Sequence, residues 1–507
     1  MPTLSNKHAN AQRVFYPGFN GGLNLSVPNE SVPKNELKEA LNVEFSSLTG
    51  SMKVRGGLVW SGHFDREIID VVPVLGRQGF LARQLNANIY YNKLYFFKWN
   101  TTWPVQNSLS GVGGDGNTPI IPMSIVPWVD ADDKECWLIA AGGGLNKFID
   151  SPIPKIEAVL APGNIKFIFI RDNRVGIVVG DDVIKFSAVG DCESWTNDPN
   201  DESSAQQVEV GYKDGMNITA VVPLSKDLII FKSPPNEPDK GTIYRLTGSY
   251  PEWQVVEVAH NIGTFSQQSV CVAGNDVFFA TVGGLATLSN VTSYGEVKAN
   301  WPDRKVSTAL AQEIDSSAKV YDVPVKQQIW LSPNKDSKQL WVLDYTRGIW
   351  TKFEFPERII YAAGVDNSLF VFIGKDVYEV NDWYTHDDTS GGASKQNITA
   401  KMKLGTILSG RQTLIKGVFA SFGLFPLCKA NIKLGDFVMD FTIAGSVDYI
   451  YSDTDIAYND DDPLVPMQGV LTSRRRCIIR DWALTPEVTI TGGGCSLSTI
   501  GLETVEV

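Results

Sequence analysis

Residues 166–188 read KFIFIRDNRVGIVVGDDVIKFSA, and this stretch decides the fold. It holds three runs of β-branched and aromatic residues, separated by short turns built on Asp-Asn and on Gly-Asp-Asp. Short apolar runs joined by tight turns favour antiparallel hairpins. The sequence therefore predicts an antiparallel meander of three strands.

The same pattern recurs on both sides of this stretch. A set of four candidate strands lies within 218–258, further sets begin at positions 269, 328 and 359, and two more are indicated within 69–148. The sets repeat roughly every 40 to 50 residues, which is the period of four-stranded propeller blades. Packing such blades around an axis buries both faces of each meander. We predict an all-β fold whose main body is a β-propeller of about six to eight irregular four-stranded blades.

The two ends of the chain differ from this repeating middle. The first part is rich in glycine and proline and holds one candidate helix, KNELKEAL at 34–41, of about two turns. Beyond residue 405 the apolar runs lengthen. The sequence predicts an N-terminal docking segment with one short helix (1–65), a propeller (66–405) and a C-terminal β-sandwich or closing blade (406–507).

Charge and cysteine usage exclude several classes of protein. The formal net charge of −12 argues against a protein that coats nucleic acid, and it fits either plain solubility or a conduit wall that repels DNA. Six cysteines form no C-x-x-C pair, so they are expected as small core residues in a reducing compartment. The sequence shows no signal peptide and no apolar run of about 20 residues. This predicts a protein made in a cytoplasm without a membrane anchor.

Motifs that would carry catalysis are missing. The chain holds no G-x-S-x-G, H-E-x-x-H or P-loop, and the glycine-rich GVGGDG at 111–116 runs into NTPIIP, which cannot start a helix cleanly. Acidic loops at 130–135 and 453–462 could bind a hard cation, but a solvated loop is the favoured interpretation. We therefore expect no catalytic, cofactor or metal site and no enzymatic activity. A propeller glycosidase remains the competing hypothesis, because two acids can meet from distant blades.

The opening FNGGLNLSVPNESVPKNELKEALNVEFSSLTGSMKVRGG, at 19–57, resembles the start of phage tail hub and nozzle proteins. In that family a Gly-Gly-Leu-Asn phrase leads to Glu-Ala-x-Asn-Val, then to a Gly and an Arg-Gly pair. Three later stretches, at 183–196, 228–288 and 327–353, agree with the family in order. The matching positions of the opening are Gly21, Gly22, Leu23, Asn24, Glu39, Ala40, Asn42, Val43, Gly50, Arg55 and Gly56.

The resemblance is to the packaged-DNA stabilization proteins and propeller-built tail nozzles of short-tailed phages. It implies a structural protein of the virion tail, assembled in the host cytoplasm as a ring, expected to be a hexamer. The ring would dock beneath portal and adaptor, carry a needle, spike or fibres, and retain and then release double-stranded DNA without sequence readout. The alternative is a propeller-fold tail protein that binds or degrades glycans.

Two sets of residues are candidate contact sites. The basic run Arg474, Arg475 and Arg476 is a candidate for phosphate or an acidic neighbouring subunit, although a charged edge strand that resists aggregation is slightly favoured. Tryptophans near blade boundaries, Trp195, Trp253, Trp301, Trp341 and Trp350, are expected to pack between blades rather than to stack on ligands. The candidates for docking to the adaptor or to the next subunit are Phe15, Tyr16, Phe19, Leu23, Leu37 and Leu41.

Overall fold

The computed structural model describes residues 12–16, 18–46, 50–64, 67–74, 79–84, 93–98, 101–104, 121–130, 133–235, 237–291, 296–302, 304–365, 367–424, 428–442, 469–493 and 495–506. The chain forms two units. We call Trp60–Leu340 with Glu357–Glu379 the propeller unit. We call Met1–Val59 with Trp341–Pro356 and Val380–Val507 the sandwich unit.

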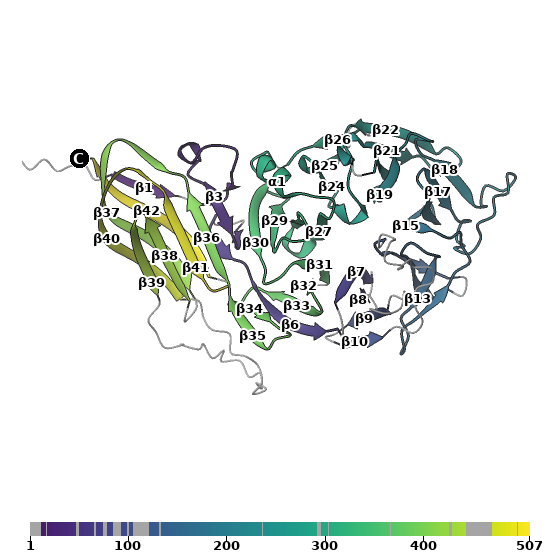
Figure 1. Ribbon diagram of the computed structural model, residues 1–507, viewed down its shortest axis with the longest axis horizontal. Coiled ribbons are helices and arrows are strands. Elements are labelled where there is room, and N and C mark those ends of the chain that lie inside the picture. Colours follow the sequence, from purple (N-terminus) through teal and green to yellow (C-terminus); the bar gives the residue numbers. More distant parts are fainter. Residues whose placement is uncertain are drawn as a thin grey trace, which may run out of the picture. The chain divides into compact units, whose positions relative to one another are not determined.

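The propeller consists of four-stranded antiparallel blades, and in blades 1 to 6 the strands pair in chain order (Figure 1). Blades 1 and 2 contain β7 (Ile68–Val74), β8 (Gly79–Gln84), β9 (Lys93–Lys98), β10 (Thr101–Pro104), β11 (Ser124–Val129), β12 (Glu135–Ala140), β13 (Asn146–Ile149) and β14 (Lys155–Ala158). Blades 3 and 4 contain β15 (Ile165–Arg171), β16 (Arg174–Val179), β17 (Val183–Phe186), β18 (Gln206–Glu209), β19 (Asn217–Leu224), β20 (Asp227–Ser233), β21 (Thr242–Thr247) and β22 (Gln254–His260).

The later blades complete the ring. Blade 5 contains β23 (Val270–Ala273), β24 (Asp276–Thr281), β25 (Gly284–Val291) and β26 (Glu296–Asn300). Blade 6 contains β27 (Lys319–Val323), β28 (Gln328–Ser332), β29 (Gln339–Asp344) and β30 (Ile349–Glu354), and the boundary between the two units passes through β29. Blade 7 contains β31 (Ile359–Val365), β32 (Ser368–Ile373), β33 (Asp376–Asn381) and, as its outer strand, β6 (Gly57–His63).

The first strand of each blade lies at the centre of the ring. These strands contact one another in the cyclic order β7, β11, β15, β19, β23, β27, β31 and back to β7. The predicted β-propeller is therefore confirmed, and the described strands make seven blades.

The last blade is closed by a strand from far earlier in the chain. The side chains of Trp60 and His63 on β6 meet Asp376 on β33, with Trp60 Nε1 at 3.3 Å and His63 Nδ1 at 2.7 Å from the Asp376 Oδ1 atom. The Phe64 backbone N–H donates to the Lys375 carbonyl oxygen at 2.8 Å. Side-chain and backbone contacts thus both fasten the closing strand.

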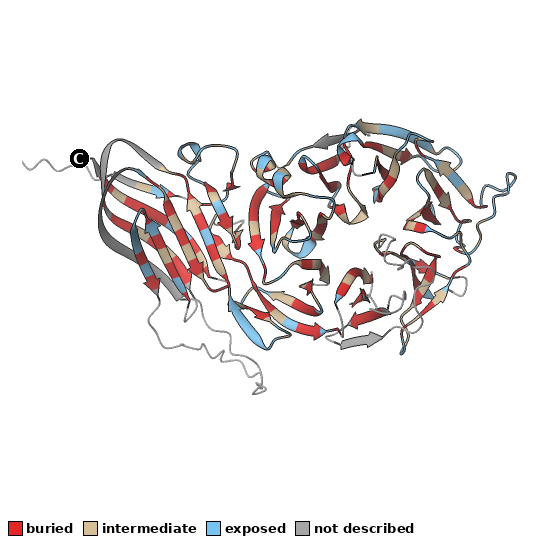
Figure 2. Ribbon diagram, in the orientation of Figure 1, coloured by how far each residue is buried: buried red, intermediate tan, exposed pale blue. Residues whose placement is uncertain are grey.

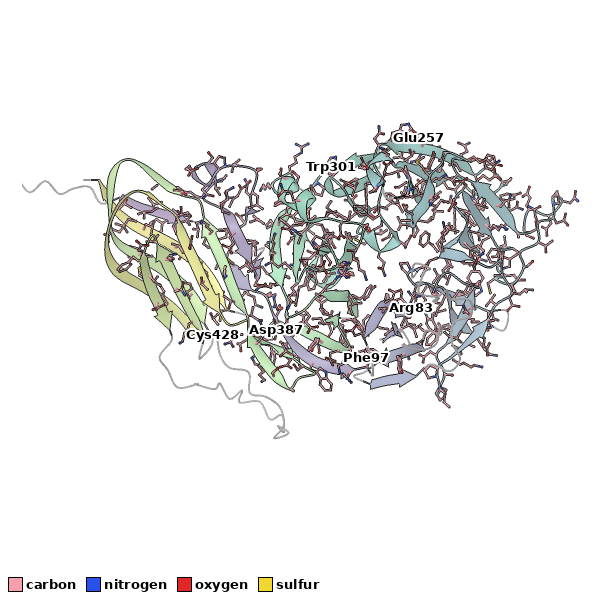
Figure 3. All side chains as sticks on the ribbon, in the orientation of Figure 1. Arg83, Phe97, Glu257, Trp301, Asp387 and Cys428 are labelled. Atoms are coloured by element: carbon pink, nitrogen blue, oxygen red, sulfur yellow. The ribbon has the colours of Figure 1, made fainter. Side chains whose placement is uncertain are left out.

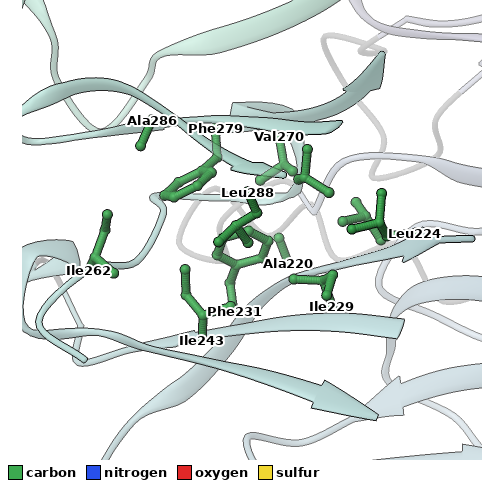
Figure 4. Packing of buried hydrophobic residues seen from close by; sticks show 12 residues of the cluster. Ala220, Leu224, Ile229, Phe231, Ile243, Ile262, Val270, Phe279, Ala286 and Leu288 are labelled. Carbon is green, nitrogen blue, oxygen red and sulfur yellow. The ribbon is translucent and has the colours of Figure 1, made fainter. Parts of the chain in front are cut away.

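The hydrophobic core lies between the blades rather than in one place. In each of five described clusters the buried side chains come from two neighbouring blades. Figure 4 shows the cluster between blades 4 and 5, where the rings of Phe231 and Phe279 lie 5.0 Å apart. Burying a side chain of this size contributes about 1.5–3 kcal/mol. Figure 2 shows the buried residues along the inner strands, with exposed residues at the outer strand β22.

A single turn of 3₁₀ helix, η3 (Gln267–Ser269), ties four blades together next to the axis. The Gln267 side chain accepts from the Val221 backbone N–H at 2.8 Å and donates to the Val221 carbonyl at 3.0 Å. Gln268 Nε2 donates to Asp70 Oδ1 at 2.9 Å. The Ser269 hydroxyl donates to the Ala318 carbonyl at 3.0 Å. Because blades 1 and 5 are not neighbours, the bond between Gln268 and Asp70 spans the centre of the ring.

The sandwich unit consists of two sheets. One contains β1 (Gln12–Tyr16), β4 (Val43–Phe45), β5 (Met52–Val54), β37 (Ile407–Leu424), β40 (Gly469–Leu484) and β42 (Ser496–Glu506). The other contains β2 (Gly22–Leu23), β3 (Glu36–Leu41), β30, β36 (Thr399–Leu404), β38 (Lys429–Leu434), β39 (Phe437–Thr442) and β41 (Pro486–Thr491). The rings of Phe422 on β37 and Phe441 on β39 lie 5.1 Å apart, so the two sheets pack face to face. The two-stranded hairpin of β34 (His386–Thr389) and β35 (Ser394–Asn397) also belongs to this unit.

The helix predicted at 34–41 is wrong, because this segment forms strand β3. β3 pairs with β36 in antiparallel fashion and with β2 and β30 in parallel, so it lies inside a sheet. Backbone pairing on both sides outweighs the helix propensity of Glu, Lys and Leu. The only α-helix in the described part of the chain is α1 (Ser307–Glu313), and no described helix is long and apolar enough to cross a membrane.

The boundaries also differ from the expected three parts. The segment 1–65 is not a separate docking module, since Met1–Val59 belongs to the sandwich unit and the strand that follows from Gly57 closes blade 7. Residues 380–405 belong to the sandwich unit and not to the propeller. The physical reason is strand pairing between distant parts of the chain, which local sequence patterns do not record.

Candidate functional site

Arg55, the arginine of the Arg-Gly phrase in the family resemblance, lies in a buried polar network of the sandwich unit. Its guanidinium donates to both oxygens of Asp387, which Figure 3 labels, at 2.9 Å to Oδ1 and 2.6 Å to Oδ2. Arg55 also donates to the Glu354 carbonyl oxygen at 2.6 Å, and its guanidinium carbon lies 4.3 Å from the centre of the Phe355 ring. Arg55 is 2% exposed and Asp387 is 3% exposed, so this is a buried bidentate ion pair.

Asn42, from the Glu-Ala-x-Asn-Val phrase, completes the network. Its Oδ1 accepts from Arg55 Nε at 3.0 Å and from the Glu354 backbone N–H at 2.7 Å, while its Nδ2 donates to the Thr399 carbonyl at 2.9 Å. Its backbone is left-handed, with φ of 57°, a conformation that asparagine tolerates better than most residues. Two residues of the resemblance thus join four separate stretches of the chain inside one unit.

The six docking candidates do not form one exposed surface. Phe15 is 50% exposed, but Tyr16, Phe19, Leu23 and Leu37 are at most 2% exposed. Burial raises the pKa of the Tyr16 phenol well above its ordinary value. Leu41 is half-buried. These residues were chosen from the segment 15–23 and the predicted helix 34–41, and four of the six are buried in the structure, which leaves Phe15 as the most accessible member.

The basic run Arg474, Arg475 and Arg476 lies on β40, which ends the pairing order of its sheet beside β37. The side chains of these arginines lie outside the described residues, so the contact with phosphate or an acidic subunit stays a prediction. The glycine-rich segment 111–116 and the acidic loop 453–462 also lie outside the described residues.

Two hollows open beside the turns that follow the inner strands of blades 2, 3 and 4. The first, of about 720 Å³, is lined by polar and charged groups that include Arg171, Asp172, Lys226 and Asp227. Arg171 donates to the Leu246 and Gly248 carbonyls at 2.8 and 2.5 Å, so its charge belongs largely to the hollow's wall.

The second hollow, of about 790 Å³, lies between blades 2 and 3. Its wall includes Trp128 and the acidic residues Asp130, Asp133 and Glu135, whereas the Trp137 ring packs on Phe148 in the core between blades 1 and 2. Lys147 Nζ lies 3.3 Å from Asp130 Oδ2, which neutralises one of the three acids. Aromatic rings beside carboxylates are suited to ligands with both apolar and hydroxyl faces.

The structure brings some expected packing residues together. The indole of Trp253 lies 4.4 Å from the Phe186 ring, so it packs between blades 3 and 4 as predicted. Trp195 packs on the cluster between blades 2 and 3, and Trp341 and Trp350 are buried against each other with ring centres 6.3 Å apart. Trp301 is 37% exposed. No group of three or more metal-ligating side chains occurs within the described ranges.

Comparisons with known proteins show architecture only. No family model and no curated protein matches the chain. A solved exo-β-1,3-galactanase from Phanerochaete chrysosporium is 10% identical with a TM-score of 0.29, covering 89% of this chain and 99% of that chain. A puromycin-hydrolyzing peptidase of Mycobacterium tuberculosis is 9% identical with a TM-score of 0.40, covering 69% of this chain and 62% of that chain. BBS1N, solved in complex with ARL6DN, is 8% identical with a TM-score of 0.36, covering 65% and 98%.

The expectation that the chain has no enzymatic activity is wrong as an exclusion. It was drawn from missing linear motifs, and missing motifs do not rule out a catalytic site. Two of these three structures are enzymes, although each is at most 10% identical to this chain. Propeller enzymes can assemble a site from distant blades, so the absence of a linear motif does not exclude catalysis. At this low identity, the similarity to these structures does not assign an activity to this chain either.

Sequence reasoning missed the residues that hold the blades together. Lys232 is fully buried and its ammonium contacts Asp182 at 2.7 Å and Asp214 at 2.8 Å. Asp70 and Arg83 form a second buried pair. A charged residue inside an otherwise apolar strand, as in LIIFKS at 228–233, is the signal that could have found Lys232.

Proposed function

We propose that this chain is a structural subunit of a phage tail hub or nozzle, located in the virion tail and assembled in the host cytoplasm. It forms a homo-oligomeric ring, of six copies, below portal and adaptor. The ring extends the exit channel for double-stranded DNA, helps to retain the packaged genome, and carries a needle, spike or fibres.

The network around Arg55 carries this proposal. The residues that match the family's opening phrases, Asn42 and Arg55, are buried and hydrogen-bonded across distant segments. Gly22 supports the same reading, because its φ is 68° and a Cβ there would lie 2.6 Å from the Ile349 side chain. Positions selected by resemblance are thus positions on which this fold depends, as expected for a shared fold and not for chance similarity.

The test is to purify particles of a phage that encodes the chain and to locate it by mass spectrometry and immunogold labelling. We expect the chain at the tail, in a fixed ratio to the portal protein. Particles that assemble, retain DNA and infect without the chain would end the proposal.

A matched pair of surface variants tests the docking role. Phe15→Ser removes an apolar side chain that is 50% exposed, and Val438→Ser removes one that is 51% exposed in the same unit. We expect Phe15→Ser to reduce incorporation into particles at least tenfold and Val438→Ser to leave incorporation unchanged. Equal incorporation of both variants would remove Phe15 from the docking surface.

The second hollow favours a competing function, the binding or degradation of glycans by the same propeller. Trp128 and the carboxylates in its wall give the supporting observation. Incubation with host polysaccharide, followed by analysis of bound and released oligosaccharide, separates the two functions. Release that Glu135→Gln abolishes would favour the enzyme.

A further inference from the structure

Cationic side chains gather beside the axis of the propeller unit. Arg83 on β8 is fully buried, and Figure 3 labels it on the inner side of the ring of blades. Its Nη2 donates to the Ile121 carbonyl at 2.9 Å and lies 3.3 Å from Asp70 Oδ2. Its Nε and Nη1 are buried and have no hydrogen-bond partner among the described residues.

Two more cations belong to the same region, because the charges of Arg83 and Arg358 both act on Lys319. Lys319 begins β27, and the pKa of its ammonium lies below the ordinary value. Burial is the main cause, the charges of Arg358 and Arg83 add to it, and Asp70 opposes it. The Lys319 ammonium donates to the Ile360 carbonyl oxygen at 3.4 Å. Arg358 Nη2 donates to the Ser317 carbonyl at 3.3 Å, and its buried Nε has no partner within the described ranges.

One carboxylate does not balance this charge. The Asp70 oxygens already accept from the backbone N–H groups of Val71 and Met123, at 3.0 and 2.5 Å, and from Gln268 at 2.9 Å. Arg83 and Lys319 both act on this saturated carboxylate, and Arg358 adds a third cation that acts on Lys319. Asp322, also on β27, has a buried Oδ1 without a partner in the described part of the chain, so it forms no ion pair here.

Buried water would satisfy the free N–H groups but would leave the excess positive charge in place. Burying unpaired N–H donors and uncompensated charge is costly, and an anion removes both costs at once. Lys319 and Arg358 are only half-buried, so solvent reaches part of each side chain.

We propose that Arg83, Lys319 and Arg358 form a binding site for one small oxyanion of the phosphate, sulfate or carboxylate class. The oxygens of the anion accept from the free Nε and Nη1 of Arg83, and the two half-buried cations close over it. This site is independent of the proposed tail function and lies wholly in the propeller unit.

The first experiment titrates the full chain with phosphate, sulfate or acetate at constant ionic strength and follows thermal unfolding. Above saturation, each tenfold rise in anion concentration should lower the apparent unfolding constant about tenfold. Lys319→Met should raise the anion concentration at which this stabilisation begins at least tenfold. Lys240→Met is the control, since Lys240 is exposed and forms its ion pair with the also exposed Glu237, and it should respond like wild type.

Sulfate and phosphate also stabilise proteins by a general salt effect, which acts equally on both variants. An equal response in wild type and Lys319→Met, or no response, would overturn the proposal and leave water as the occupant. Should Lys319→Met fail to fold, Arg358→Gln gives the same test at a half-buried position. Crystals soaked in selenate provide a direct reading. An anomalous peak in contact with Arg83 is expected, and peaks only at exposed sites would contradict the site.

Discussion

The two units of the chain are both built from antiparallel β-strands, but they are connected in opposite ways. In blades 1 to 5 every strand pairs with a neighbour in the sequence. In the sandwich unit Leu37 on β3 pairs with Leu404 on β36, and Val43 on β4 belongs to the same sheet as the far C-terminal β42. The propeller is therefore specified by local hairpins, whereas the sandwich depends on contacts between the two ends of the chain.

The largest expected effect tests this dependence in the sandwich unit. Arg55→Met leaves Asp387 buried and unpaired, which should cost about 3–5 kcal/mol of the free energy of unfolding. Peptide-resolved hydrogen exchange should show the loss in the sandwich strands, with the propeller protected as before. Lys53→Met is the control, because Lys53 and Asp382 form a pair that is 33% and 43% exposed, worth at most about 1 kcal/mol. A loss spread evenly over both units would break the comparison.

Backbone geometry gives the next largest contrast. Gly22 and Gly180 both have left-handed backbones, with φ of 68° and 77°, but only Gly22 is crowded by neighbouring atoms. Gly180→Ala should cost about 1 kcal/mol through its backbone, and Gly22→Ala about 3 kcal/mol because overpacking against Ile349 is added. Urea denaturation of both variants measures the difference. An equal loss of unfolding free energy in the two variants would show that the sandwich unit rearranges to accommodate the added methyl group at position 22.

A buried lysine gives the corresponding test in the propeller. Lys232→Met removes the ammonium that joins blade 4 to Asp182 in blade 3 and should cost about 2 kcal/mol. Hydrogen exchange should rise in blades 3 and 4 and stay unchanged in the sandwich unit. Lys166→Met removes the half-buried partner of the exposed Asp181 in the same region and should cost under about 1 kcal/mol. An equal loss in both variants would contradict a special role for Lys232.

The smallest effect is a pH dependence from the same contact. Burial raises the pKa of Asp182, but hydrogen bonds from Lys232 and from the Lys213 backbone, with the charges of Lys232 and Lys166, outweigh it and hold the pKa below its ordinary value. Because the folded-state pKa is lowered, Asp182 stabilises the propeller above its unfolded pKa of about 3.9, and this stabilisation is lost as pH falls through the folded pKa. Urea midpoints between pH 5 and pH 2 should fall less steeply for Asp182→Asn. Parallel slopes for the two proteins would refute this linkage.

The same contrast explains what the sequence could predict. The turns at Asp172-Asn173 and Gly180 leave a local pattern, so the meander of blade 3 and the propeller itself were predictable. The segment 34–41 looks helical because its pairing partners lie far along the chain, and no local pattern records them. The network of Arg55 and Asp387 was invisible for the same reason, although the family resemblance selected Arg55. The cluster of Arg83, Lys319 and Arg358 escaped notice because these three residues lie far apart in the sequence.

The outer strand of blade 7 has a consequence for synthesis of the chain. β6 leaves the ribosome before any blade is made, whereas its partner β33 emerges only after the other six blades. At about 5–20 residues per second, β6 waits on the order of half a minute with an unpaired edge. The nascent chain therefore needs shielding, by a chaperone or by its own upstream segment, until the ring can shut. A circular permutant that places β6 directly after β33 would remove that delay.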